Sequence, residues 1–233
     1  MTNINKKKEI VKYSKLFSIE SFSPIRSGNI SIRSKLNNQE GFFISPSGKK
    51  NLDLTIKDIV FVSLNGDIEK NKKPSSEWRF HLDLYNFTTC NAVVHAHSKF
   101  AVICSCLYKK IPSFHYMIAL TGKKTVKVAN YALFGSKKLS INILNAIKGS
   151  KSCLISNHGQ ISIGNNLPDA YELANEVELL CEYYYYCRLQ KRPKILNYQE
   201  MQSVLNKIKS YLVVRAISLF LFSKITVILL FYQ

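Results

Sequence analysis

The chain has 233 residues, which is enough for one domain with a substantial hydrophobic core. With 46% hydrophobic and 21% charged residues it is typical of a globular protein, which excludes a disordered or fibrous chain. The formal net charge is +18, but the lysines are scattered and are not interleaved with aromatic residues, so no nucleic-acid partner is expected.

The cysteine spacing and the N-terminal residues both favour a cytoplasmic location. The six cysteines form no C-x-x-C pair and show no spacing typical of secreted proteins. The first residues, MTNINKKKEI, are basic, but no apolar segment of a signal peptide follows them. We therefore expect a protein of the reducing cytoplasm.

The first third of the chain predicts one helix followed by three short strands. The helix covers about residues 6–17, where apolar residues recur at helical spacing. Glycine-containing turns separate the strands from each other. The strands are expected at Ile30–Ser34, Phe42–Ile44 and Ile59–Ser63.

The rest of the chain mixes helices and strands without a regular βαβ rhythm. A helix is predicted to start at Pro74–Glu77, where hydroxyl groups precede a carboxylate, and another to run from Pro168 to Leu189. Between them we expect the strand Ala92–His97, the helix Phe100–Leu107 and a pair of strands within Cys153–Ile163. This order predicts a layered α/β domain and not a doubly wound sheet.

Three histidines provide the first indication of chemistry. His95 and His97 alternate on a predicted strand, so their side chains should point to the same face. His158 lies in a turn between the two later strands. Three imidazoles with an open fourth position are typical of a catalytic zinc, although paired histidines also occur as surface or hydrogen-bonded residues without a metal.

Several small, hydroxylated turns form a second group of candidate residues. Backbone N–H groups and hydroxyls in such turns can bind a phosphate, although each one alone is as well explained as an ordinary turn. Glu77, directly after the last turn, can likewise be a simple carboxylate at the start of a helix. The turns are Gly28-Asn29, Ser47-Gly48 and Ser75-Ser76.

Taken together, these segments resemble the class II aldolase/adducin family, and within it most closely the L-fuculose-1-phosphate aldolases. The resemblance covers roughly Ile10 to Tyr211 and implies a central, mainly antiparallel β-sheet flanked by helices. The matching segments occur in the family's order: SGNISIR (27–33), ISPSG (44–48), PSSEWRFH (74–81), HAH (95–97), IPSFHYMI (111–118), YALFG (131–135) and NHG (157–159).

The resemblance also implies a role for each candidate residue. His95, His97 and His158 would bind Zn²⁺, and Glu77 would move the substrate proton and could serve as a fourth ligand. The substrate phosphate would be bound by residues of the three turns. These are Gly28, Asn29, Ser47, Gly48, Ser75 and Ser76.

Residues outside these turns would complete the site. Tyr116 would act as a proton donor in the site of a neighbouring subunit, which implies a homotetramer with sites at its interfaces. Tyr211, the third catalytic candidate beside Glu77 and Tyr116, would lie with Phe134 near the aldehyde end of the substrate.

The implied activity is the reversible cleavage of a ketose 1-phosphate, such as L-fuculose 1-phosphate, into dihydroxyacetone phosphate and an aldehyde such as L-lactaldehyde. An L-ribulose-5-phosphate 4-epimerase would resemble Ser-Ser-Asp-Thr where this chain has Ser-Ser-Glu-Trp at 75–78, which favours the aldolase. A methylthioribulose-1-phosphate dehydratase is a second alternative. A non-catalytic, adducin-like binding module is a third, against which the retained histidines and Glu77 argue.

The C-terminus departs from the family pattern. We expect the aldolase-type domain to cover residues 1–211 and an atypical apolar tail to cover 212–233. The tail has about the length of a membrane span, but Arg215 and Lys224 interrupt it. Contact with a membrane, packing against a neighbouring subunit and a degenerate, frame-changed end are the alternatives, and each leaves the role of Tyr211 open.

Overall fold

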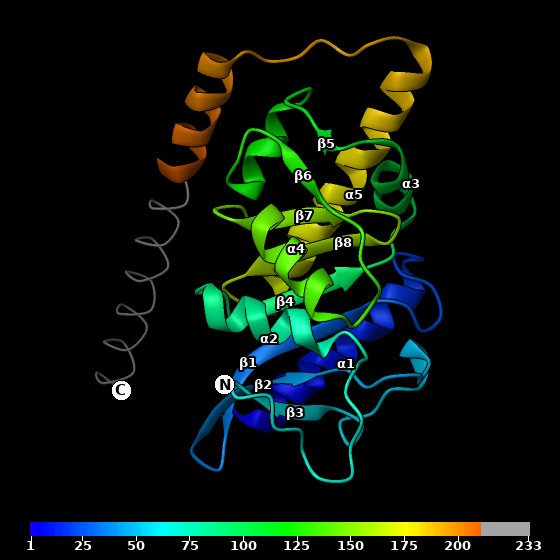
Figure 1. Cartoon of the computed structure of the whole chain (residues 1–233), viewed down its shortest axis with the longest axis vertical. Coiled ribbons are helices and arrows are strands. Elements are labelled where there is room, and N and C mark those ends of the chain that lie inside the picture. Colours follow the sequence, from blue (N-terminus) through cyan, green and yellow to red (C-terminus); the bar gives the residue numbers. More distant parts are fainter. Residues whose placement is uncertain (211–233) are drawn as a thin grey trace, which may run out of the picture.

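A single mixed sheet forms the centre of the computed structural model, which describes residues 1–210 (Figure 1). Neighbouring strands are antiparallel except β6 and β7, which run parallel. This confirms the predicted α/β layered fold with a mainly antiparallel sheet. In spatial order the strands are β3 (Val60–Ser63), β2 (Gln39–Ile44), β1 (Asn29–Leu36), β4 (Ala92–Ala96), β8 (Gly159–Gly164), β7 (Ser152–Ile155), β6 (Val126–Ala129) and β5 (Lys110–Ile111).

Helices cover both faces of the sheet. On one face α2 and α4 pack over the strands, and on the other lie α1, α3 and α5. Two short 3-10 helices, η1 and η2, lie in connecting segments, and a further helix spans 198–210. The helices are α1 (Asn3–Ile19), η1 (Asn51–Asp53), α2 (Trp78–Phe87), α3 (Lys99–Leu107), η2 (Tyr116–Thr121), α4 (Lys137–Ile147) and α5 (Leu167–Gln190).

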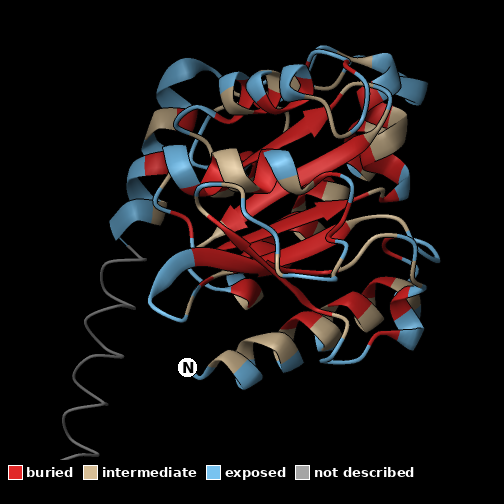
Figure 2. Ribbon diagram, turned by 60° about the horizontal axis from the view of Figure 1, so that its bottom comes forward, coloured by how far each residue is buried: buried red, intermediate tan, exposed pale blue. Residues whose placement is uncertain are grey.

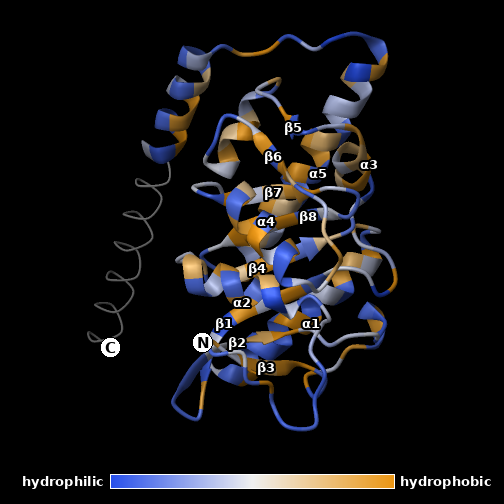
Figure 3. Ribbon diagram, in the orientation of Figure 1, coloured by the Kyte–Doolittle hydropathy of each residue, from blue (hydrophilic) through white to orange (hydrophobic). Residues whose placement is uncertain are grey.

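The sheet is buried on both faces, and apolar side chains fill the layers on either side (Figures 2 and 3). Burial of this apolar surface is the main term that stabilises the fold. Ile10 and Phe17 of α1 pack against Ile30 and Ile32 of β1. On the other face Phe80 and further residues of α2 and α4 complete a separate cluster. The sheet therefore holds α1 and α2 on opposite sides of β1.

The sequence patterns predict no element between α3 and β7, where the structure has β5, η2, β6 and α4. The elements predicted elsewhere are present, with boundaries that differ by a few residues. Tyr211 and the predicted tail lie outside the described residues, so the division of the chain after residue 211 stays a prediction. Among residues 1–210 no helix combines the length and apolar character needed to cross a bilayer.

Gly28 occupies the point where the loop entering β1 approaches the end of β4. Its φ of +77° lies in the left-handed region, and a Cβ at this position would be 2.6 Å from the His95 carbonyl oxygen. Gly48 has a similar φ of +79°, but a Cβ there would meet no atom within 4 Å. Gly28 is therefore required both by its backbone conformation and by close packing, and Gly48 only by its conformation.

The two glycines form a matched pair for a stability experiment. We expect Gly48→Ala to lower the free energy of unfolding by about 1–2 kcal/mol, because only the left-handed conformation is strained. Gly28→Ala should lower it by about 2–4 kcal/mol, since the methyl group also overpacks the loop against β4. Chemical denaturation of both variants measures the difference, and equal losses would contradict the close-packing argument.

Candidate active site

Strand β4 brings two histidines to one face of the sheet, as their alternation predicts. His95 lies on β4, fully buried between its pairing partners Asn29 of β1 and Ile161 of β8. His97 follows directly after the strand, and its backbone N–H donates to Ser23 Oγ at 2.9 Å. The two Nε2 atoms are 3.0 Å apart. The sheet face that carries them is the one covered by α2, where Phe80 contacts the His95 ring.

The turn between β7 and β8 supplies the third histidine. Asn157 takes a left-handed φ of 56°, which asparagine adopts more readily than most residues, and the His158 N–H donates to the Ile155 carbonyl at 3.1 Å. The His158 ring centroid is 4.9 Å from that of His95 and 4.7 Å from that of His97. The turn therefore brings a residue 61 positions further along the chain against the histidine pair.

Glu77 completes the cluster from the start of α2. Its carboxylate is buried, with Oε2 3.2 Å from His95 Nε2 and Oε1 3.1 Å from His158 Nε2. Burial alone would raise the pKa of Glu77, but the imidazoles of His95 and His158 together hold it well below its ordinary range. The carboxylate is therefore ionised at neutral pH.

The four side chains have the donor set and spacing of a metal site. One ligand atom from each of Glu77, His95, His97 and His158 lies within 4.8 Å of all the others. Tetrahedral zinc with Zn–N distances of about 2.0–2.1 Å places its ligands about 3.3 Å apart, close to the separations of 3.0–3.2 Å found here. Glu77 Oε1 accepts no hydrogen bond of normal geometry from the described residues, which suits an oxygen that faces a cation.

The surroundings keep the histidines in the form that binds metals. His95 Nδ1 donates to the Gln160 carbonyl oxygen at 2.8 Å, so Nε2 presents its lone pair to the cluster. Burial, and then the charges of His95 and His158, lower the pKa of His97 to about 3, so its ring is neutral. The His97 ring can therefore bind a divalent metal without first losing a proton.

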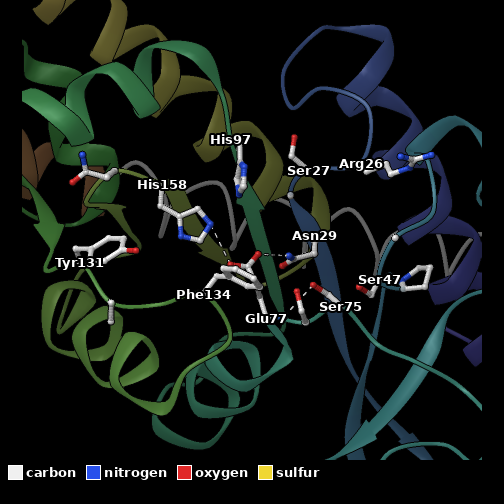
Figure 4. Close-up of a pocket in the computed structure, with 16 residues that line it drawn as sticks. Arg26, Ser27, Asn29, Ser47, Ser75, Glu77, His97, Tyr131, Phe134 and His158 are labelled. Carbon is white, nitrogen blue, oxygen red and sulfur yellow. Dashed lines mark hydrogen bonds and ion pairs between the residues drawn. The ribbon is translucent and has the colours of Figure 1, made fainter.

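Glu77, His97 and His158 of the cluster line one wall of a pocket with a volume of about 400 Å³, within the range of small-molecule sites (Figure 4). Glu77 lies between His97 and His158 on one side and Asn29 and Ser75 on the other. All six residues predicted to bind phosphate line this pocket, together with Phe134. The six are Gly28, Asn29, Ser47, Gly48, Ser75 and Ser76.

Two predicted residues are not brought to the pocket within the described chain. Tyr116 lies in η2, is 53% exposed and does not line the pocket. Tyr211 lies outside the described residues. The roles of both stay predictions, and that of Tyr116 requires a second subunit.

Arg26 and Tyr131 line the pocket although sequence patterns did not point to them. Arg26 precedes the Ser27-Gly28 turn, and a positive charge beside a predicted phosphate turn is the pattern that could have identified it. Tyr131 opens the segment that also contains Phe134, and both are largely exposed at the pocket mouth. A lone exposed tyrosine carries no pattern that marks it as a site residue.

Comparison with known proteins is consistent with this geometry. Residues 8–185 match the family described as Class II Aldolase and Adducin N-terminal domain, which is well over half of the chain. The chain belongs to this family. The predicted family is thereby confirmed, and with it the predicted enzyme class, a lyase of the aldolase type.

Relatives in the class II aldolase family cover most of the chain. The 5-methylthioribulose-1-phosphate/5-deoxyribulose-1-phosphate aldolase of Rhodospirillum rubrum is 43% identical over 79% of this chain and 82% of its own. The L-fuculose phosphate aldolase of Haemophilus influenzae is 41% identical over 79% of this chain and 84% of its own. A solved L-fuculose 1-phosphate aldolase superposes with a TM-score of 0.84 at 33% identity, covering 90% of this chain and 98% of that one.

Removing one histidine of the cluster should weaken metal binding in this class II aldolase. We expect His158→Ala to lower the affinity for Zn²⁺ by more than about 100-fold, the upper range for changes to residues that only support a metal ligand. His115→Ala is the matched control, because His115 lies at the start of η2 and outside the cluster. Titration with zinc measures both affinities, and unchanged binding in His158→Ala would refute the assignment.

His81, buried behind the site, should make the stability of the metal-free protein sensitive to pH. Burial, and then the charge of His95, lower the pKa of His81 to about 3 from an ordinary value of 6.5. Between these values the unfolded chain binds more protons, so this residue's contribution to folding weakens as the pH falls below 6.5. The wild type should therefore lose its stability advantage over His81→Gln by about 1.4 kcal/mol for each unit by which the pH falls below this ordinary value.

Denaturant unfolding of both forms at several pH values between 7 and 4 measures this difference. The pH-dependent contributions of the other buried groups are the same in both proteins, so they largely cancel in the difference between the two unfolding free energies. A stability difference that stays constant across the range would show that His81 is protonated in the folded state.

Proposed function

We propose that the protein is a zinc-dependent aldolase that reversibly cleaves a ketose 1-phosphate into dihydroxyacetone phosphate and an aldehyde. The observation that carries the proposal is the convergence of Glu77 with three histidines, of which His97 and His158 line one wall of a pocket whose other wall consists of small, hydroxylated turns. A metal cluster and an anion-binding surface facing one cavity suit a phosphorylated substrate with a reactive carbonyl group.

The metal would be held by His95, His97 and His158, with Glu77 close enough to act as a fourth ligand. A divalent ion in this cluster supplies a Lewis acid that stabilises negative charge on the substrate oxygens. As neutral ligands, the three imidazoles would leave the positive charge of the ion in place.

The turns at the other wall would bind the substrate phosphate. Ser47, Ser75 and Ser76 contribute hydroxyl groups, and Gly28 and Gly48 allow the backbone to approach the anion closely. Arg26, at the same end of the pocket, adds a full positive charge that pairs well with phosphate oxygens. The phosphate is remote from the reacting carbons, and the binding energy gained there can hold those carbons in position.

Glu77 would transfer the proton that the reaction requires. In the direction of condensation its carboxylate takes a proton from the hydroxymethyl carbon of dihydroxyacetone phosphate, which leaves an enediolate. The enediolate carbon then forms a bond to the aldehyde carbon, and the aldehyde oxygen becomes an alkoxide that must be protonated. Cleavage of the ketose phosphate follows the same steps in reverse.

Tyr116 is our candidate for the donor of that last proton, acting in the pocket of a neighbouring subunit. Its 53% exposure, and the fact that it does not line the pocket of its own chain, agree with a residue that serves another subunit. We therefore propose a homotetramer with active sites at the interfaces. Tyr211 remains a second candidate near the aldehyde end.

The substrate is proposed to be a 1-phosphorylated ketose with an apolar far end. The relatives' names give 5-methylthioribulose 1-phosphate, 5-deoxyribulose 1-phosphate and L-fuculose phosphate, which all lack a hydroxyl at the end remote from the phosphate. Phe134 and Tyr131 at the pocket mouth would contact this end. Because these relatives are named aldolases, carbon–carbon cleavage is favoured over the epimerase and dehydratase alternatives.

A substrate panel with one catalytic variant tests this proposal. We expect release of dihydroxyacetone phosphate from at least one of the three ketose 1-phosphates, and a fall in kcat of about 100- to 10,000-fold in Glu77→Gln. Glu172→Gln, at an exposed position of α5, is the control and should keep wild-type activity. Zinc-loaded protein that cleaves none of these compounds would refute the aldolase assignment.

A further inference from the structure

A row of buried polar side chains extends from Glu77 away from the pocket, between β1 and α2. Asn29 and Ser31 are alternate residues of β1, so both point to the face covered by α2. His81 and Tyr85 follow Glu77 at intervals of four residues along α2, so the three lie on one side of the helix. Asn29, Ser31, His81 and Tyr85 are all at least 96% buried.

Hydrogen bonds join these side chains into one unbranched chain. Asn29 Nδ2 donates to Glu77 Oε2 at 3.0 Å, and Asn29 Oδ1 contacts His81 Nε2. On the other side of the ring, His81 Nδ1 is 2.7 Å from Ser31 Oγ, which is in turn 2.7 Å from the Tyr85 hydroxyl. Each polar group in the chain therefore has a partner on both sides, apart from the terminal Tyr85 hydroxyl.

The chemistry of these groups fixes the direction of every bond. An ionised carboxylate can only accept, so Asn29 must present its NH₂ group to Glu77 and its oxygen to His81. His81 Nε2 must then carry the proton, and in a neutral ring Nδ1 can only accept, so Ser31 donates to it. Ser31 Oγ consequently accepts from the Tyr85 hydroxyl. All four donors point toward Glu77.

The surroundings of His81 keep its ring neutral, as this direction requires. The ring is fully buried and stacks against Phe80 at a centroid distance of 4.8 Å. Burial, and then the charge of His95, lower the pKa of His81 to about 3. A neutral ring with Nδ1 engaged by Ser31 has a single tautomer, with its proton on Nε2.

We propose that His81 is a positioning residue that holds the Asn29 amide in the orientation that presents its N–H group to Glu77. Without the donor at Nε2 the amide could turn its oxygen toward the carboxylate, and Glu77 would lose its charge-assisted hydrogen bond. The chain positions Glu77 and does not conduct protons to it, because the Asn29 amide does not pass a proton from oxygen to nitrogen.

This arrangement gives the two carboxylate oxygens different tasks. Oε2 accepts a hydrogen bond from the Asn29 amide, whereas Oε1 lies 3.1 Å from His158 Nε2 and accepts from no amide group of the described residues. Oε1 is therefore the oxygen left free to take the substrate proton. That step rests on the proposed function, but the orientation of Asn29 and the tautomer of His81 do not.

Two substitutions at position 81 separate positioning from packing. His81→Phe keeps an aromatic ring against Phe80 but removes both nitrogen atoms. His81→Gln loses the ring but can place an amide N–H where Nε2 donates to Asn29. If His81 only fills space, the Phe variant should be the more active of the two; if it orients Asn29, the Gln variant should be.

We expect His81→Phe to lower kcat by about 10- to 100-fold, the loss that corresponds to one hydrogen bond to a charged group. The acidic limb of its kcat–pH profile should move up by about one to two pH units, because the carboxylate loses a donor that stabilises its ionised form. His81→Gln should keep the larger share of activity and the wild-type limb. A Phe variant with wild-type activity, or two variants with equal losses and an unmoved limb, would overturn the proposal.

A nitrogen NMR measurement tests the chain of donors independently of catalysis. In the full-length protein labelled with ¹⁵N-histidine, with and without zinc, the resonances lost in His81→Gln identify this ring. We expect a protonated Nε2 and an unprotonated Nδ1 throughout pH 5–8. Protonated Nδ1, or a ring carrying both protons at pH 7, would overturn the proposal even in an active aldolase. With the expected tautomer but no cleavage of any ketose phosphate, only the proposed function fails.

Discussion

The antiparallel pairing of β1 with β4 places Asn29 opposite His95, and the geometry of the site follows from this register. Because side chains alternate along a strand, a slip of one residue would turn His95 toward the α1 side and bring Val94 under α2. The same register carries Asn29, which contacts Glu77, and the loop with Gly28 that forms part of the phosphate wall. One strand pair therefore connects the metal cluster with the predicted phosphate cradle.

The layer between β1, β4 and α2 is unusually polar for the interior of a protein. Glu77, His81, His95 and Asn29 are all buried there, and each would be costly to bury without partners. Hydrogen bonds and close charge contacts give each of these groups a partner and offset part of this cost. The polar layer thus contributes less to stability than an apolar one, but it holds the reactive groups in a single geometry, as an active site requires.

Alternation and helical spacing were enough to predict much of this layer from the sequence. They place His95 and His97 on one face and start a helix at Glu77, as the structure shows. That His158 joins them depends on the pairing of β8 with β4, which no local pattern specifies. Strand β6 has only four residues, too few for a clear pattern. Helix α4 was missed although its buried residues Leu139, Ile143 and Ile147 recur at helical spacing. Sequence patterns identify His81 only as part of a motif and not as a site residue, because its partner Ser31 is 50 residues away in sequence.

The pocket has a buried carboxylate at one end and exposed aromatic side chains at its mouth. Glu77 and the residues behind it are fixed by hydrogen bonds that do not involve the substrate. Phe134 and Tyr131 at the mouth are 62% and 63% exposed, so within this chain few contacts hold them. Under the proposed function, substitutions at the mouth would change the fit to the aldehyde end without disturbing the Glu77 carboxylate. This separation offers a physical reason why relatives named for different ketose phosphates can share one fold and one reaction type.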